Sequence, residues 1–317
     1  MAEEKDPQGA PFSHPKPYGS GVTRRQFLAV AAAGAAAAAA AALSPLRDFG
    51  GFPPLREMLQ KHFTELTPGQ KKEVLERIAS QLQEKYGAAP QLTALPPMDG
   101  VQYAYALNIG RCVGCRKCVY ACMKENNQSR DPQIQYISVL QMEKGNIDVE
   151  KSSIDYEGQV PKEGHYYMPV QCHHCETSPC TKVCPVKATW REPDGIVVVD
   201  YNWCIVCRYC EAACPYHARR FNFKEPYLPE KDFNPKIDYL SNRPRPKGTM
   251  EKCTFCLQRT RAGKYPACLE VCPTGSRKFG NMLDPDSEIS SIIRDKRVYI
   301  FKEELGTVPR FYYYTDV

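Results

Sequence analysis

Cysteine is the residue that most constrains this chain. Its sixteen cysteines fall in four groups of four, and none lies outside a group. Groups one and three share the spacing C-x2-C-x2-C-x3-C, group two has C-x2-C-x4-C-x3-C, and group four has C-x2-C-x11-C-x3-C. In chain order the members are Cys112, Cys115, Cys118 and Cys122; Cys172, Cys175, Cys180 and Cys184; Cys204, Cys207, Cys210 and Cys214; and Cys253, Cys256, Cys268 and Cys272. The fold must therefore gather closely spaced thiols four times.

The spacing of groups one and three is typical of cysteines that bind iron–sulfur cubes in bacterial ferredoxins. In that pattern a tight loop supplies three ligands to one cluster. The fourth thiol, which we expect at the start of a helix, binds a neighbouring cluster. A proline follows the fourth cysteine in the pattern, and Pro185, Pro215 and Pro273 supply it, whereas Met123 takes this place in group one. We therefore predict four [4Fe–4S] clusters, with all sixteen cysteines as ligands.

Other uses of cysteine fit the spacing less well. Gaps of two residues repeated within one group make poor disulfides, and a chain of 317 residues is too long for a cysteine-stapled miniature. Structural zinc normally joins two separated C-x2-C pairs, and three cysteines within seven residues would crowd a tetrahedral ion. Covalent haem needs C-x-x-C-H, and no cysteine pair here is followed by histidine.

The N-terminal residues, 1–44, are interpreted as an export signal of the twin-arginine type. Arg24 and Arg25 precede Phe27-Leu28 and an apolar run from Ala29 to Leu43, although alanine stands where lysine is usual. An ordinary alanine-rich helix is the alternative. The run is short and alanine-rich for a membrane span, which needs about 20 strongly apolar residues, and retention as a weak anchor stays open. We expect export in the folded state to the periplasm or the outer face of the cytoplasmic membrane. That route would protect cluster thiols from an oxidising compartment.

Residues 45–100 lack cysteine and are predicted to form a helical extension and a linker. A helix is expected from Thr67 at the N-cap, with Pro68 and Gln70 behind it, to a stop at Gly87. A shorter helix is expected over residues 55–63, and the proline-rich residues 88–100 are interpreted as a linker. We favour a packing role for this extension over a separate binding module.

The remaining chain divides into a four-cluster ferredoxin domain, 101–283, and a C-terminal partner-docking tail, 284–317, which is expected to lie over the domain or against a partner. Short strand-prone runs are expected at 135–142, 166–170 and 195–200, and a surface loop over 225–247, which is rich in proline and asparagine. His173 and His174 lie inside group two, where they either tune a cluster or meet a partner, and His217 is expected to be a packing residue. Five basic residues either offset cluster charge or are solvated: Arg111, Arg116, Lys117, Arg208 and Lys252.

The four groups, in this order and spacing, resemble the iron–sulfur subunits of the complex iron–sulfur molybdoenzyme family. These are the four-cluster ferredoxin subunits of dimethyl sulfoxide, polysulfide, tetrathionate and nitrate reductases. The resemblance runs from about Ile109 to Gly280 and includes the segments 171–175, 204–210 and 251–256, and the ending 305–310 is also similar. The family usually has glycine where Val206 stands. Some relatives lack one cysteine of group three and carry a [3Fe–4S] cluster, but here that group is complete.

The resemblance implies an α+β fold of two ferredoxin-like units with crossed ligation, to which the N-terminal helical extension is added. Each implied cluster takes the first three cysteines of one group and the last cysteine of another. The implied sets are Cys112, Cys115, Cys118 with Cys272; Cys253, Cys256, Cys268 with Cys122; Cys172, Cys175, Cys180 with Cys214; and Cys204, Cys207, Cys210 with Cys184.

The implied function is electron transfer without catalysis by this chain. No G-x-G-x-x-G or phosphate-binding loop occurs in the sequence, and the formal charge of +6 does not indicate a nucleic-acid partner. The expected partners are a molybdopterin-type catalytic subunit and an integral membrane quinone-reactive subunit or a multihaem cytochrome, with membrane contact mainly through the partner. Two alternatives remain open: a relay in a membrane-bound nickel–iron hydrogenase, or a soluble or cytochrome-linked periplasmic ferredoxin.

Overall fold

The structure is a computed structural model that describes residues 67–316. The paired arginines and the short helix expected over residues 55–63 lie outside the described residues. Within residues 67–316, no helix combines the length and the apolarity that crossing a membrane requires.

The largest sheet joins the two ends of the cysteine-bearing segment. β2 (Tyr103–Asn108) precedes group one, and β10 (Arg277–Asn281) follows group four and pairs with it antiparallel. β12 (Phe311–Tyr314) lies on the other side of β2, in parallel, and β11 (Val298–Tyr299) completes the order β10-β2-β12-β11. All six residues of β2 are buried, because one face packs on the main core and the other receives α9 (Glu288–Asp295).

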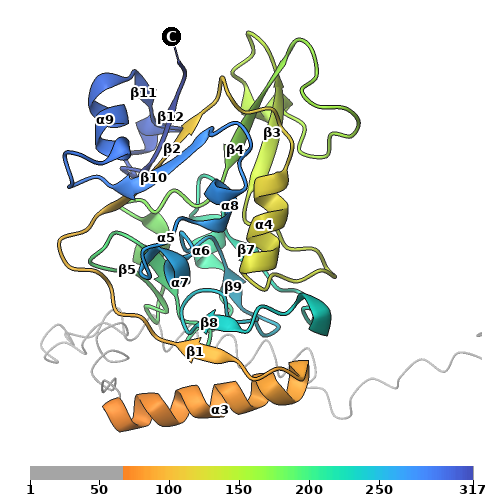
Figure 1. The fold of residues 1–317 in the computed structure, drawn as a ribbon, viewed down its shortest axis with the longest axis vertical. Coiled ribbons are helices and arrows are strands. Elements are labelled where there is room, and N and C mark those ends of the chain that lie inside the picture. The colour runs from red at the N-terminus through yellow and green to blue at the C-terminus, as the bar shows by residue number, and fades with distance from the viewer. Residues whose placement is uncertain (1–66, 317) are drawn as a thin grey trace, which may run out of the picture. The chain divides into compact units, whose positions relative to one another are not determined.

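Hairpins and very short helices make up the rest of the domain (Figure 1). β3 (Ser138–Glu143) pairs with β4 (His165–Val170), β5 (Thr189–Arg191) with β6 (Val197–Val199), and β7 (Arg220–Phe221) with β9 (Met250–Glu251), all antiparallel. The helices are α4 (Lys117–Glu125), α5 (Pro179–Lys182), α6 (Tyr209–Ala212), α7 (Leu257–Thr260) and α8 (Ala267–Glu270), with 3-10 turns at Val149–Lys151, Glu230–Asp232 and Glu303–Leu305. The content is mixed α+β, and each of the three strand-prone runs overlaps a strand: β3, β4 and β6.

The helix predicted after Thr67 is confirmed as α3 (Pro68–Tyr86). Thr67 and Gln70 cap each other's backbone N–H groups, and Gly87 ends the helix with a φ of 67°. One face of α3 buries Ile78, Leu82 and Tyr86 against Leu228, Phe233 and Ile237. The linker expected over 88–100 contains a strand, β1 (Gln91–Thr93), which pairs in parallel with β8 (Lys236–Asp238) beside α3 (Figure 1). This contact supports the packing role of the extension.

The interpretation of segment 225–247 as a surface loop was wrong in part, because eight of its 23 residues are buried and only seven are exposed. Asn242 is fully buried: its side-chain amide donates to the carbonyls of Lys236 and Glu125 at 2.7 and 3.2 Å, and its Oδ1 accepts from the N–H of Asp238 at 2.8 Å. Polar side chains that satisfy backbone groups can fold inward, so a composition typical of loops did not mean exposure here.

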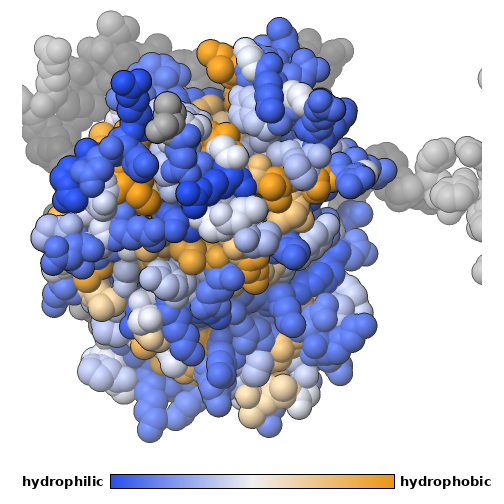
Figure 2. All heavy atoms as spheres, turned by 45° about the horizontal axis from the view of Figure 1, so that its top comes forward, coloured by the Kyte–Doolittle hydropathy of each residue, from blue (hydrophilic) through white to orange (hydrophobic). Residues whose placement is uncertain are grey.

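The C-terminal residues are part of the domain fold, and no structural break occurs at residue 283. β12 is an inner strand of the main sheet, and Phe311 and Tyr313 are fully buried. Tyr312 and Tyr314 pack with α9 on the opposite face, as the two-residue period of a strand requires. The aromatic residues of this segment therefore fill the core, and its partner-docking role stays a prediction. The molecular face shown in Figure 2 is mostly hydrophilic, with small apolar patches between polar side chains.

Candidate metal centres

The structure brings the sixteen cysteines, all of them free thiols, together in four sets of four. Three sets line cavities of similar size, about 350, 340 and 380 Å³ with their open mouths included. These are site I (Cys112, Cys115, Cys118, Cys272), site III (Cys172, Cys175, Cys180, Cys214) and site IV (Cys184, Cys204, Cys207, Cys210). They are the sets that the resemblance implies. Their role as iron ligands stays a prediction.

Site II consists of Cys122, Cys253, Cys256 and Cys268, all buried. The side-chain amide of Asn126 donates to the sulfurs of Cys122 and Cys256 at 3.5 and 3.6 Å and so joins group one to group four. Burial raises the pKa of Cys122 well above its usual value, and the charges of the other three thiols raise it further. These four thiols are therefore neighbours in a largely dry site.

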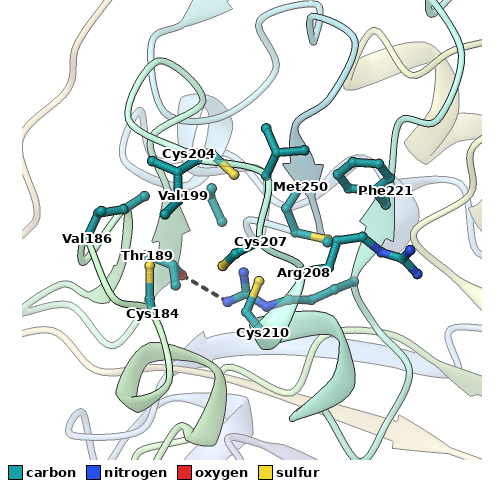
Figure 3. Close-up of a pocket in the computed structure, with 14 residues that line it drawn as sticks. Cys184, Val186, Thr189, Val199, Cys204, Cys207, Arg208, Cys210, Phe221 and Met250 are labelled. Atoms are coloured by element: carbon teal, nitrogen blue, oxygen red, sulfur yellow. Dashed lines mark hydrogen bonds between the residues drawn. The ribbon is translucent and has the colours of Figure 1, made fainter. Parts of the chain in front are cut away.

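Site IV is partly open to solvent, because Cys207 is exposed and Cys204 is half-buried. Its four cysteines surround a hollow beside Val199 and Met250 (Figure 3). The dashed line in Figure 3 joins Thr189 to the guanidinium of Arg219, which donates to the threonine hydroxyl at 2.9 Å. Site IV is thus open to solvent on one side and backed by a buried cation on the other.

Each group places its third cysteine, not its fourth, at a helix start. Cys118, Cys180, Cys210 and Cys268 are the second residues of α4, α5, α6 and α8. The fourth cysteine follows four residues later, inside α4 or just beyond the end of the shorter helices. The expectation of a helix start at the fourth thiol was wrong because C-x3-C spans about one helical turn of 3.6 residues. One turn thus separates two thiols that belong to different sites.

A left-handed residue precedes the second cysteine in all four groups. Gly114, His174, Val206 and Phe255 have φ values of 72°, 45°, 70° and 54°. Successive N–H groups in such loops can point into a concavity that favours negative charge, as the N–H of Phe255 does by donating to the sulfur of Cys253 at 3.4 Å. Only glycine adopts this conformation freely, and other residues pay roughly 1–2 kcal/mol. The sequence signal for this left-handed conformation is position: the residue directly before the second cysteine adopts it in every group.

The thiols fit an iron–sulfur cube and would bind it with proton release. Burial raises the pKa of Cys112 to about 11 and that of Cys175 to about 12, so both are protonated at neutral pH without metal. Thiolates are the metal-binding form, so the positive charge of iron would have to displace these protons. Cys272 differs: burial raises its pKa, but hydrogen bonds from Thr274 and from following backbone N–H groups outweigh burial and lower it.

The donor set within each site suits a cluster. Four thiols that line one hollow, as in sites I, III and IV, are the donor set of a cube. Among residues 67–316, no three Cys, His, Asp or Glu side chains converge closely enough to hold one metal ion.

The two histidines of group two are buried and neutral. Burial lowers the pKa of His173 to about 3 and that of His174 well below its usual value. His174 Nδ1 accepts the N–H of Val197 at 3.0 Å, and its ring stacks on Phe255 at 3.7 Å. Both therefore pack inside the domain and do not form a partner surface. His217, expected to be a packing residue, is exposed instead.

Of the basic residues expected near clusters, only Lys252 is buried, with its ammonium donating to the carbonyl of Cys253 at 2.6 Å. Arg116 lies over the ring of Tyr156 at 4.2 Å, and the other three are exposed. Sequence reasoning missed two buried cations, Arg219 and Arg277, which touch or line the thiol sites. The signal was present in the sequence: both follow a fourth cysteine in the pattern C-P-x3-R.

Comparisons with known proteins agree with this geometry. Two models of a 4Fe-4S dicluster domain match the chain, one over residues 111–188 and the other over residues 164–229 and 239–282. The chain is 39% identical over 241 residues to the Hdr-like menaquinol oxidoreductase iron-sulfur subunit 1 of Archaeoglobus fulgidus, covering 67% of this chain and 82% of the relative. It is 36% identical over 230 residues to one of the subunits of selenate reductase from Mesobacillus selenatarsenatis, covering 69% and 74%. It is 34% identical over 219 residues to one of the subunits of tetrathionate reductase from Salmonella typhimurium, covering 67% and 72%.

Proposed function

Because this chain belongs to the family of ferredoxin-type iron–sulfur subunits of reductase complexes, we propose that it connects a molybdopterin-type catalytic subunit to a membrane quinone-reactive subunit or a cytochrome. It is an electron-transfer subunit and not the catalytic one, with four [4Fe–4S] clusters as its cofactors. When bound, such clusters accept and release one electron at a time, without making or breaking covalent bonds to a substrate.

The observation that carries the proposal is the order in which the thiol sites follow one another. Arg277 contacts the sulfurs of Cys118 in site I and Cys268 in site II. Gln171, the neighbour of Cys172 in site III, donates to the sulfur of Cys253 in site II at 3.9 Å. Arg219 lines both site III and site IV. These contacts form the series I, II, III, IV, which is the arrangement that a relay needs.

The thiols in the middle of this series are more deeply buried than those at its two ends. All four thiols of site II are buried, and the ring of His174 from group two stacks on that of Phe255 from group four at 3.7 Å. Burial of this kind keeps water away from a cluster and limits side reactions along the series. Cys207 in site IV is exposed, and the cysteines of site I are half-buried. Exchange with partners is therefore proposed at sites I and IV.

The two ends differ in the surface that they offer. Around site IV, Ile205, Val206 and Tyr209 are 55%, 44% and 62% exposed. Beside site I, the exposed Lys117 gives the rim a basic character, whereas Arg111 is paired with Asp316. We assign the apolar end to the membrane partner and the basic end to the catalytic subunit, because exposed apolar side chains beside a functional group favour an apolar partner surface.

The proposed location is the periplasm or the outer face of the cytoplasmic membrane, after export in the folded state. Support comes from Arg24 and Arg25 before the apolar run that starts at Ala29. Folded export would also fit thiols that must hold clusters before they reach an oxidising compartment.

Elemental analysis of the native complex, purified through a tag on this chain, tests the function. Iron together with molybdenum or tungsten supports the pterin-linked relay. Iron with nickel would move the assignment to a hydrogenase, and iron alone, after haem iron is subtracted, to a cytochrome-linked or soluble ferredoxin. Zinc in place of iron, in a sample kept free of oxygen, would overturn the electron-transfer assignment.

A further inference from the structure

Two arginines are buried beside the thiol sites without an acidic partner. Arg219 and Arg277 are 2% and 3% exposed. Within residues 67–316, neither guanidinium forms an ion pair with a carboxylate. A buried cation is strongly unfavourable unless negative charge and hydrogen-bond acceptors compensate it. The nearest groups that become negative are the cysteine sulfurs.

Arg277 lies between sites I and II. Its Nη2 donates to the sulfur of Cys118 at 3.3 Å, and its Nη1 lies 3.9 Å from the sulfur of Cys268. Gln171 Oε1 and the hydroxyl of Tyr105 accept from Nη1 at 2.9 and 3.3 Å and fix the plane of the guanidinium. One side chain thus contacts a thiol from each site of the first pair.

Arg219 takes the same place in the second pair. It lines the cavities of both site III and site IV and is held by its hydrogen bond to Thr189 at 2.9 Å. An arginine guanidinium keeps its proton in proteins, so Arg219 carries a permanent positive charge beside both sites.

The sequence supports the equivalence of the two arginines. Arg219 stands five residues after Cys214, and Arg277 stands five residues after Cys272, each in a C-P-x3-R segment. The corresponding places after Cys122 and Cys184 hold Asn127 and Thr189. The chain therefore supplies one arginine to each pair of sites and not one to each site.

We propose that Arg219 and Arg277 are positioning residues of the relay, each holding a fixed positive charge between two neighbouring clusters and raising the reduction potentials of both. Reduction adds negative charge to a cluster, and a nearby cation that donates to its sulfurs stabilises the reduced form. A charge shared by two clusters also offsets their mutual repulsion when both are reduced. The inference rests on the proposed function, because it requires clusters in all four sites.

The test is an EPR-monitored redox titration of the purified chain, kept anaerobic, in wild type and in Arg277→Gln and Arg219→Gln. Cys115→Ser and Cys207→Ser identify which signals belong to sites I and IV. We expect Arg277→Gln to move two potentials, those of sites I and II, in the negative direction and to leave the other two unchanged. Arg219→Gln should move the potentials of sites III and IV in the negative direction and leave those of sites I and II unchanged. Arg111→Gln is the control, since this side chain is adjacent to Cys112 in sequence but 53% exposed and bound to Asp316.

Two results would overturn the inference: full iron content with four unchanged potentials, or a uniform change in all four. If a glutamine variant does not fold, Arg277→Lys and Arg219→Lys decide the question. Each lysine retains the positive charge. The potentials of the two sites that it joins should therefore stay closer to wild type than in the neutral variants Arg277→Met and Arg219→Met. Lysine and methionine variants with equal potentials would contradict the charge-based role. Absence of cluster signals in the wild type would instead contradict the proposed function.

Discussion

Group one and group three have the same cysteine spacing but lie in different surroundings. In both loops a left-handed residue precedes the second cysteine, and a left-handed arginine precedes the helix: Arg116 before α4 and Arg208 before α6. Each arginine lies over an aromatic ring, Tyr156 at 4.2 Å and Phe223 at 4.7 Å. Tyr156 is buried, whereas Phe223 is 60% exposed. The spacing thus specifies the loop conformation, while the neighbours decide whether the loop belongs to the core or to the surface.

The residue before the second cysteine illustrates this difference most directly. Gly114 lies against Tyr167, and a Cβ at Gly114 would overlap the tyrosine ring. Val206 takes nearly the same φ, 70° against 72°, but its side chain is 44% exposed. The loop of group one therefore needs glycine, because a side chain at this place would overlap Tyr167 and would be strained at a left-handed φ. Loop three tolerates a β-branched residue, with strain, because solvent lies above it.

The largest effect is expected when the residue before the second cysteine of group one is replaced by the valine that group three has at this place. Gly114→Val should destabilise the domain by about 3 kcal/mol or more, since it adds left-handed strain to an overlap with Tyr167. Chemical denaturation and iron content of the purified chain measure the effect. The reciprocal change, Val206→Gly, is the control and should leave iron content unchanged. A Gly114→Val protein with wild-type stability would show that loop one is not confined by the core.

Replacement of the second cysteine in group one and in group three should also show that the two groups lie in different surroundings. Cys115→Ser and Cys207→Ser each remove one of four ligands from a site, so each should lose or convert one cluster, up to about a quarter of the iron. We expect the loss at site IV to stay local because Cys207 is exposed, and the loss at site I to lower the thermal unfolding temperature as well. Iron analysis, EPR and thermal unfolding distinguish these outcomes. Equal unfolding temperatures in the two variants would argue against the difference.

Iron release should follow exposure. In an anaerobic time course with a strong iron chelator, the site IV signal should decay before the signals of sites I and III, and site II should decay last. The reason is that Cys207 is exposed while every thiol of site II is buried. EPR spectra taken during the time course would follow each signal. Simultaneous decay of all four would mean that release requires global unfolding.

The smallest expected effect is relief of strain at Val206. Val206→Asn places a residue that accepts the left-handed region at a φ of 70°, and it should raise the free energy of unfolding by up to about 1 kcal/mol. Denaturant titration of the variant beside wild type measures this. A decrease in stability would show that apolar contacts of the Val206 side chain outweigh the strain.

Sequence predicted the features that depend on local spacing. The capping residues of α3 and the four thiol groups could be recognised because each is encoded within a few neighbouring residues. Arg219 and Arg277 were missed because their burial depends on contacts with groups distant in sequence. For example, Arg277 reaches Cys118, 159 positions away. The segment 225–247 was misjudged for the same reason: Asn242 satisfies the carbonyl of Glu125, 117 positions away, and composition gives no sign of such a partner.

The position of β2 in the sheet has a consequence for the timing of synthesis. β2 leaves the ribosome before any cysteine of the four groups, yet its neighbours are β10, made after Cys272, and β12, which is made later still. Site I likewise joins the first cysteine, Cys112, to the last, Cys272. A nascent chain therefore holds up to fifteen thiols before Cys272 is made and site I can form. The main sheet likewise waits for β12, and a premature stop that removes β12 would leave β2 without its parallel neighbour.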